Sequence, residues 1–99
     1  MNRVTLINRL GIKPGKIDEF IAAQRVIATT IPVGLLGGRL YRSTDGQSVI
    51  LIAQFESMQA QEEIRAGDAF KEQLKELAPL VESSTPTLYE EAYTYGDFQ

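Results

Sequence analysis

The feature that most constrains the fold is the stretch QSVILIAQFES at residues 47–57, because its apolar residues follow one another without alternation. From Val49 to Phe55 only Gln54 is polar. Successive side chains of a strand point to opposite faces of the sheet, so a strand with one wet face alternates. The pattern therefore predicts a strand covered on both faces. The chain has 99 residues and is expected to form one domain, residues 1–99, which leaves few elements to cover the second face.

Turn and helix-end signals divide the chain into six elements. In order, we expect a strand at 4–10, a helix at 17–31, a strand at 37–43, the strand at 47–57, a helix after Ser57 that is broken at 67–68 and reaches Pro79, and a strand at 85–98. Asp45-Gly46 predicts a hairpin, Ser57 a helix N-cap, and Asp68 a second N-cap. The order βαββαβ predicts an α+β, ferredoxin-like fold, with a four-stranded antiparallel sheet and its helices on one face.

The helices of such a fold leave one face of the sheet bare. We expect the helix side to carry Val4, Leu6, Asn8 and Leu10 with Leu51, Ala53 and Phe55. Ile7, Ile50 and Ile52 then point to the helix-free face, where they form an apolar patch that soluble monomers rarely expose. Tyr89, Tyr93 and Tyr95 lie on one face of the expected last strand and are interpreted as interface anchors, with a proton relay as the alternative. The simplest prediction is a homodimer through the helix-free face.

Composition excludes several classes of function. The chain has no cysteine and no histidine, which removes thiolate nucleophiles, the usual general base and the common zinc and haem ligands. Carboxylates are not clustered as in a metal site, so we expect no metal and no cofactor. The net charge is −3 without a basic cluster, which argues against nucleic acid as a partner. Without a membrane-length apolar run or a signal-peptide pattern, we expect no membrane partner and a cytoplasmic protein.

Three short motifs resemble a known family. KPGKIDEF at 13–20, LYRS at 40–43 and FES at 55–57 are similar to segments of the antibiotic biosynthesis monooxygenase family of dimeric α+β barrel proteins. The resemblance covers nearly the whole chain and implies a dimeric α+β barrel. In one branch of that family, enzymes oxidise phenolic or anthrone-like substrates with molecular oxygen and use no metal, flavin or haem. That chemistry suits a chain without histidine or cysteine.

Another branch of the family degrades haem, and the chain departs from it. NRL at 8–10 is similar to that branch, in which the Asn is an active-site residue. Phe55, however, stands where that branch has a tryptophan, and its axial histidine aligns near Leu74. A further histidine common in the family aligns near Ile64. Haem degradation therefore ranks last among the functions that the resemblance implies.

The candidate site residues are polar or aromatic positions in apolar surroundings. Asn8 interrupts an apolar strand face and Gln24 interrupts a helical stripe, so both are candidate catalytic residues, with a structurally satisfied amide and a solvated stripe edge as the alternatives. Candidates for substrate binding are Phe20, Phe55, Ile64, Phe70, Leu74, Arg39 and Tyr41. The apolar members are equally consistent with plain core, and the arginine with a solvated or interface position.

Three functions remain open at this point. The first is cofactor-independent monooxygenation of a small aromatic, phenolic or quinol-type substrate in a pocket between helices and sheet. The second is a non-catalytic homodimer that binds a small apolar or aromatic ligand. The third is a purely structural dimer whose cavity is filled by its own side chains. The first two share fold, pocket and dimer, and only a polar centre in the pocket distinguishes them.

Overall fold

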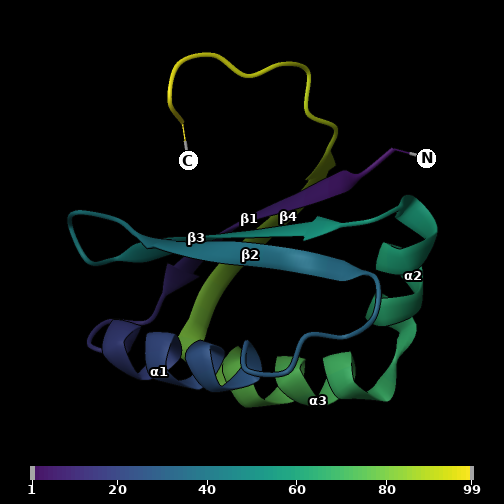
Figure 1. Ribbon diagram of the computed structural model, residues 1–99. Coiled ribbons are helices and arrows are strands. Elements are labelled where there is room, and N and C mark those ends of the chain that lie inside the picture. Colours follow the sequence, from purple (N-terminus) through teal and green to yellow (C-terminus); the bar gives the residue numbers. More distant parts are fainter. Residues whose placement is uncertain (1, 99) are drawn as a thin grey trace.

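A computed structural model describes residues 2–98 and confirms the expected order of elements (Figure 1). They are β1 (Val4–Ile12), α1 (Ile17–Ile27), β2 (Leu35–Arg42), β3 (Ser48–Phe55), α2 (Met58–Ala66), α3 (Asp68–Leu77), the short 3₁₀ helix η1 (Ala78–Leu80) and β4 (Val81–Tyr89). The strands form one antiparallel sheet in the order β2-β3-β1-β4. The helices lie on one face of the sheet, as the sequence predicts. No helix in the described part of the chain is long and apolar enough to cross a membrane.

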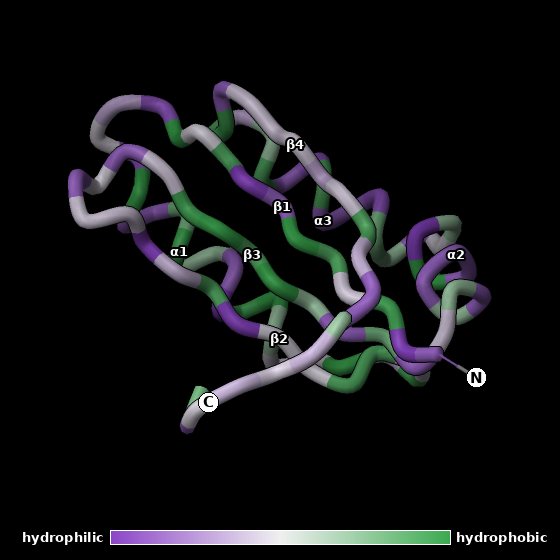
Figure 2. Tube along the Cα trace, turned by 90° about the horizontal axis from the view of Figure 1, so that it is seen from above, coloured by the Kyte–Doolittle hydropathy of each residue, from purple (hydrophilic) through white to green (hydrophobic). Residues whose placement is uncertain are grey.

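The strand register confirms which residues share a face. Leu6 pairs with Ala53 and Asn8 with Leu51 on the helix side, whereas Ile7 pairs with Ile52 on the helix-free side. Apolar residues follow the central strands β1 and β3, and β4 is more polar (Figure 2). The helices cover only one face of β3, so the continuous apolar run leaves Ile50 and Ile52 on the helix-free face, where Ile50 is 37% exposed.

The main cluster of buried side chains lies toward one end of the sheet. Its members are Leu10, Ile12, Phe20, Val49 and Leu80, of which Phe20 and Val49 are fully buried. They bring together the end of β1, the first turn of α1, the start of β3 and η1. Val4, Phe55 and Ala60 are buried outside this cluster. The α3 helix, by contrast, contributes no fully buried residue. The sheet and helices are therefore closely packed at one end, and less so along α3.

The first helix is shorter than its apolar stripe predicts. It ends at Ile27, and residues 28–30 form a turn, so Ile31 lies outside it. The Thr29 hydroxyl donates to the Val26 carbonyl at 2.6 Å, and the Thr29 N–H donates to the same carbonyl at 3.1 Å. A side chain that bonds its own backbone competes with the helical ladder, and Pro32 further along the chain cannot continue it.

The last strand is displaced from the predicted 85–98. It runs from Val81 to Tyr89, and Pro86 lies in its middle, opposite Asn8, rather than at its start. Because β4 is an edge strand, this proline is tolerated. The final pair joins Tyr89 to Thr5, near the beginning of β1, so residues 90–98 have no further length of β1 to pair with. Tyr93 and Tyr95 therefore do not lie on a strand, and the prediction that they share a strand face with Tyr89 was wrong.

The helix after β3 begins as predicted. The Ser57 hydroxyl accepts a hydrogen bond from the Ala60 N–H at 3.1 Å, which is an N-cap. The helix breaks after Ala66, and Gly67 rather than Asp68 is the N-cap of α3. Asp68 is instead in the first turn of α3, where a carboxylate interacts favourably with the helix dipole.

Candidate functional site

A large cavity lies between the helices and the sheet. Its volume is about 1770 Å³, and its walls come from all four strands and from α1, α2 and α3. Phe20 and Phe55, only 1% and 6% exposed, line its interior. Leu74 and Ile31, 51% and 59% exposed, lie where the cavity opens to solvent. The space between sheet and helices is therefore hollow and open to solvent.

Eight of the nine sequence-predicted site residues border this cavity. They are Asn8, Phe20, Gln24, Arg39, Phe55, Ile64, Phe70 and Leu74. The aromatic and aliphatic members come from α1, β3, α2 and α3 and form an apolar wall. Such a wall suits a flat apolar or aromatic molecule, with polar groups needed only to orient it.

Asn8 has a fixed orientation. Its Oδ1 atom accepts a hydrogen bond from the Ser84 hydroxyl at 3.1 Å and another from the Thr85 N–H at 3.0 Å. A backbone N–H can only donate, so Oδ1 must face β4 and Nδ2 must point elsewhere. This Nδ2 group donates to no other described residue. Asn8 thus joins β1 to β4 through its oxygen and retains two N–H donors beside the cavity.

Gln61 is a polar cavity residue that the sequence analysis missed. It lies on α2 and is 7% exposed, the one buried polar residue among those described. Its side-chain amide has no hydrogen-bond partner among the described residues, although it lines the cavity. The available signal was its spacing: it precedes Ile64 by three residues and follows the N-cap Ser57 by four. Gln24, half-buried on α1, adds a third amide to the lining.

Tyr41 does not border the cavity, and the Arg39 side chain turns away from it. Both residues are on β2, and Arg39 pairs with Ile52, a residue of the helix-free face. Arg39 borders the cavity at its rim, but its Nη1 donates to the Tyr41 hydroxyl at 3.2 Å. Its guanidinium also lies 5.9 Å from the centre of the Phe98 ring. The structure therefore places both side chains on the face of the sheet opposite the cavity.

Charged residues occur only at the margin of the cavity. Those that line it are Arg25, Arg39, Arg42, Arg65, Asp68 and Glu82, and all of them are exposed. No group of three or more carboxylates among residues 2–98 is arranged to hold a metal ion. The interior of the cavity thus offers apolar contact and amide hydrogen bonds.

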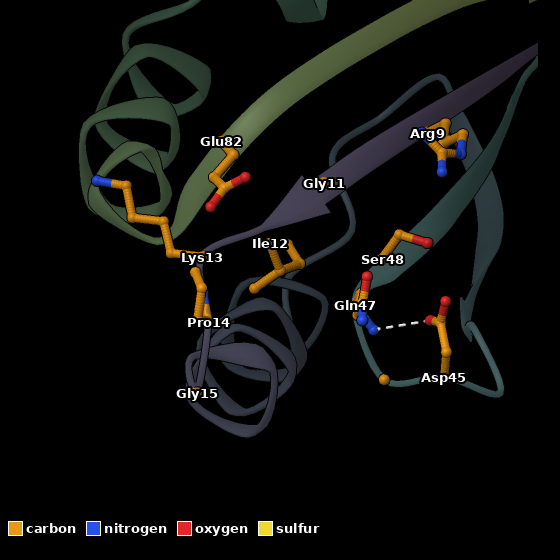
Figure 3. A pocket seen from close by; sticks show the side chains of 11 residues that line it. Arg9, Gly11, Ile12, Lys13, Pro14, Gly15, Asp45, Gln47, Ser48 and Glu82 are labelled. Atoms are coloured by element: carbon orange, nitrogen blue, oxygen red, sulfur yellow. Dashed lines mark hydrogen bonds between the residues drawn. The ribbon is translucent and has the colours of Figure 1, made fainter.

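A smaller and more polar hollow of about 550 Å³ lies beside the β2–β3 hairpin (Figure 3). Asp45 at its edge accepts hydrogen bonds from the Ser43 hydroxyl at 2.6 Å and the Gln47 N–H at 3.0 Å. These hydrogen bonds lower the pKa of the Asp45 carboxyl below its ordinary value of 3.8, and the bond from Ser43 has the larger effect. The carboxylate is thus engaged in holding the turn, which is a structural role.

Comparison with known proteins decides the family. A family model for antibiotic biosynthesis monooxygenases matches residues 3–79. The chain belongs to that family. No match was found among curated proteins.

Several solved structures are similar to this monooxygenase-family chain, and the similarity covers nearly the full length of the chain. SnoaB from Streptomyces nogalater, a cofactor-independent oxygenase solved as a single-substitution variant, is 24% identical, with a TM-score of 0.85 over 95% of this chain and 97% of that one. Rv0793 from Mycobacterium tuberculosis is 20% identical, with a TM-score of 0.80 over 95% and 99%. Protein SO0527 from Shewanella oneidensis is 25% identical, with a TM-score of 0.77 over 91% of each chain. These similarities agree with the fold described above.

Proposed function

We propose that this protein is a cofactor-independent monooxygenase that oxidises a small aromatic, phenolic or quinol-type substrate with molecular oxygen. Membership of the monooxygenase family supports the reaction class. The observation that carries the proposal is the apolar cavity of about 1770 Å³ with the Asn8 amide at its wall. Phe20, Phe55 and Phe70 are the proposed wall for the aromatic rings.

The substrate supplies the electrons in this scheme. Its phenolate or enolate form passes one electron to O₂, which gives a substrate radical and superoxide. These combine in a C–O bond, and protonation gives a hydroperoxide. The attacked carbon is a CH₂ group in the keto form of the substrate, as in an anthrone. Loss of water from the hydroperoxide converts this carbon to a carbonyl, so that one O₂ yields one carbonyl and one water. The proton released on ionisation goes to solvent at the cavity mouth.

The protein's part is to hold and stabilise an oxyanion. The two N–H donors of Asn8 Nδ2 are the proposed partners of the substrate oxygen, with Gln24 and Gln61 as further amide donors. Fixed donors in a poorly hydrated site stabilise an anion more than mobile water does. Asn8 is held by two bonds to β4, so its donors need no reorganisation. The apolar wall limits the water that reaches the hydroperoxide.

Two variants of Asn8 test this role. Asn8→Asp retains an oxygen for the Thr85 N–H and the Ser84 hydroxyl but removes both donors. We expect a melting temperature close to the wild type and at least a tenfold lower rate of oxygen uptake, corresponding to about 1.4 kcal/mol. Asn8→Ala removes both functions and should also lose about 1–2 kcal/mol of stability.

The measurement is oxygen uptake with anthrones, naphthols and hydroquinones in chelator-treated buffer, corrected for autoxidation. Wild-type uptake that exceeds autoxidation and is lost in Asn8→Asp supports the proposal. Equal uptake by wild type and Asn8→Asp contradicts the role of Asn8. If no substrate reacts above autoxidation, the oxygenase proposal fails and the binding function below takes its place.

The second candidate is a non-catalytic protein that binds a small apolar or aromatic ligand. The observation that favours it is the position of the charged groups, all of which are exposed at the margin. No proton acceptor stronger than an amide oxygen lies inside the cavity among the described residues. Binding of a naphthol without turnover, measured by calorimetry, distinguishes this candidate from the oxygenase.

We also propose that the protein acts as a homodimer through its helix-free face. Ile50, Tyr41 and Tyr89 on this face are 37%, 43% and 49% exposed. Apolar groups gathered on one face of a sheet are stabilised when a second copy covers them. A dimeric mass by light scattering at micromolar concentration is expected, and a monomeric mass would overturn the proposal.

A further inference from the structure

The loop between α1 and β2, residues 28–34, lies at the opening of the cavity, and we call it the mouth loop. In Figure 1 it rises from the end of α1 to the start of β2, in front of the space between the sheet and α3. The residues of this loop that line the cavity are Ala28, Thr30, Ile31 and Pro32. Because α1 ends at Ile27, Ile31 belongs to the loop and is not held in the hydrogen-bond ladder of a helix.

Both ends of the mouth loop are held in place. At its start, the Thr29 hydroxyl donates to the Val26 carbonyl at 2.6 Å. At its end, the Gly34 carbonyl accepts a hydrogen bond from the Glu56 N–H at 2.9 Å. Gly34 has a φ of +98°, and a Cβ atom added there would lie 2.8 Å from the Ala60 Cβ on α2. Only glycine fits both this backbone conformation and this close approach, so the end of the loop is tied to α2.

The middle of the mouth loop is apolar, exposed and without hydrogen bonds. Ile31 and Val33, on either side of Pro32, are 59% and 94% exposed. Their backbone N–H and carbonyl groups form no hydrogen bond with any other residue that the structure describes. Segments with few apolar contacts and with unpaired backbone groups move at the lowest cost in free energy. The middle of the loop can therefore move while its two ends stay in place.

The cavity is larger than a single small molecule needs. Its volume is about 1770 Å³, whereas sites for small molecules usually measure about 300–1,000 Å³ and bury most of the ligand surface. A guest held by the sheet and α1 alone would leave its outer side in water. An inward movement of the mouth loop reduces the open volume and brings the Ile31 side chain, which already lines the cavity, against the guest.

We propose that the mouth loop is a lid that closes over a bound aromatic guest, and that Ile31 is the side chain that packs on it. The inference rests on the proposed use of the cavity as a binding site, which the oxygenase and the ligand-binding candidate share. A ligand favours one of two conformations only through contacts that it makes better in that conformation. The contact with Ile31 is one that the closed lid alone provides. In the oxygenase, closure also keeps water from the oxyanion and the hydroperoxide.

Two serine substitutions in the mouth loop test this contact. Ile31→Ser removes an apolar side chain that lines the cavity, and Val33→Ser, the matched control, removes one that does not. With α-naphthol we expect Ile31→Ser to raise the Kd by about 3- to 10-fold, mainly through faster dissociation, because apolar burial on the ligand is lost. Val33→Ser should bind with the wild-type Kd. Calorimetry measures the Kd, and thermal melting should show little change, since both side chains are exposed.

Spin labels measure the movement itself, because the chain has no cysteine and each introduced cysteine is labelled alone. One pair, Val33→Cys with Lys71→Cys, joins the mouth loop to the exposed side of α3. The control pair, Thr44→Cys with Lys71→Cys, joins the β2–β3 hairpin to α3. Pulsed electron paramagnetic resonance should give a shorter distance for the first pair when α-naphthol is added, and the same distance for the control pair.

The outcomes separate the lid from the reaction. An unchanged Kd in Ile31→Ser, or the same rise in both serine variants, overturns the lid. So does an unchanged distance between the mouth loop and α3 in a chain that calorimetry shows to bind α-naphthol. Binding with lid closure but without oxygen uptake above autoxidation overturns the oxygenase and leaves the lid in place. A wild-type chain that binds no naphthol, anthrone or hydroquinone overturns the lid and both candidate functions.

Discussion

At the scale of single residues, the candidate site depends on amides rather than acids and bases. Asn8 could be singled out from the sequence because it interrupts an apolar strand face, and Gln24 because it interrupts a helical stripe. Gln61 could not be recognised in the same way, because α2 has only nine residues and most of them are polar. A buried glutamine in a short polar helix leaves almost no periodic signal in the sequence. Gln61 is recognised only from its burial in the structure.

Gln61 provides a test that separates stability from binding. Gln61 is 7% exposed and its amide has no hydrogen-bond partner among the described residues, so Gln61→Met removes no hydrogen bond within the chain. No side-chain nitrogen or oxygen among the described residues is both buried and unpartnered, so the Gln61 amide reaches the space of the cavity. We expect the free energy of unfolding to change by less than about 1.5 kcal/mol, because the substitution nearly conserves side-chain volume. Affinity for a naphthol should fall severalfold if the amide binds its hydroxyl.

Chemical denaturation and calorimetry measure the two quantities for Gln61→Met. Gln59→Met on the exposed side of the same helix is the control, and it removes only the exposed hydrogen bond of 3.1 Å that Gln59 donates to Glu63. A variant that loses stability while binding naphthol normally would show that Gln61 is structural and has no part in the site.

At the scale of elements, the hairpin between β2 and β3 offers a pH-dependent test. Hydrogen bonds from Ser43 and Gln47 lower the pKa of Asp45, so its charged form stabilises the folded state. A carboxyl whose pKa is lower in the folded chain contributes stability above its unfolded pKa, and that contribution is lost as pH falls through the folded value. The contribution should therefore be present at pH 6 and disappear below the ordinary value of 3.8.

The comparison that isolates this effect is wild type against Asp45→Asn. We expect the wild type to melt at a slightly higher temperature at pH 6 and the two to converge in acid below pH 3.8. Calorimetric scans from pH 2 to pH 7 measure this convergence. A difference in melting temperature that is the same at every pH would mean that the charge of Asp45 plays no part.

At the scale of the whole molecule, the sequence predicted the fold and the assignment of faces but not the C-terminal segment. The fold followed because strand alternation, the Asp45-Gly46 turn and the Ser57 cap all agree with one topology. The sequence predicts a strand that reaches residue 98 because Tyr93 and Tyr95 are typical strand residues at alternating positions. A strand needs a neighbouring strand to pair with, and β1 has almost no residues before Thr5, the partner of Tyr89. Residues after Tyr89 therefore form no strand, although their side chains favour one.

The uneven distribution of the core has a consequence for how a guest molecule enters. Leu10, Ile12, Phe20, Val49 and Leu80 tie the sheet to the helices at one end, while α3 has no fully buried residue. Local opening costs least free energy where few apolar contacts must be broken. Local opening is therefore expected to begin along α3, which touches the core cluster through Leu77, rather than at the packed end. Asn8 is held by β4 and not by α3, so such an opening would widen the cavity without disturbing the orientation of the Asn8 amide.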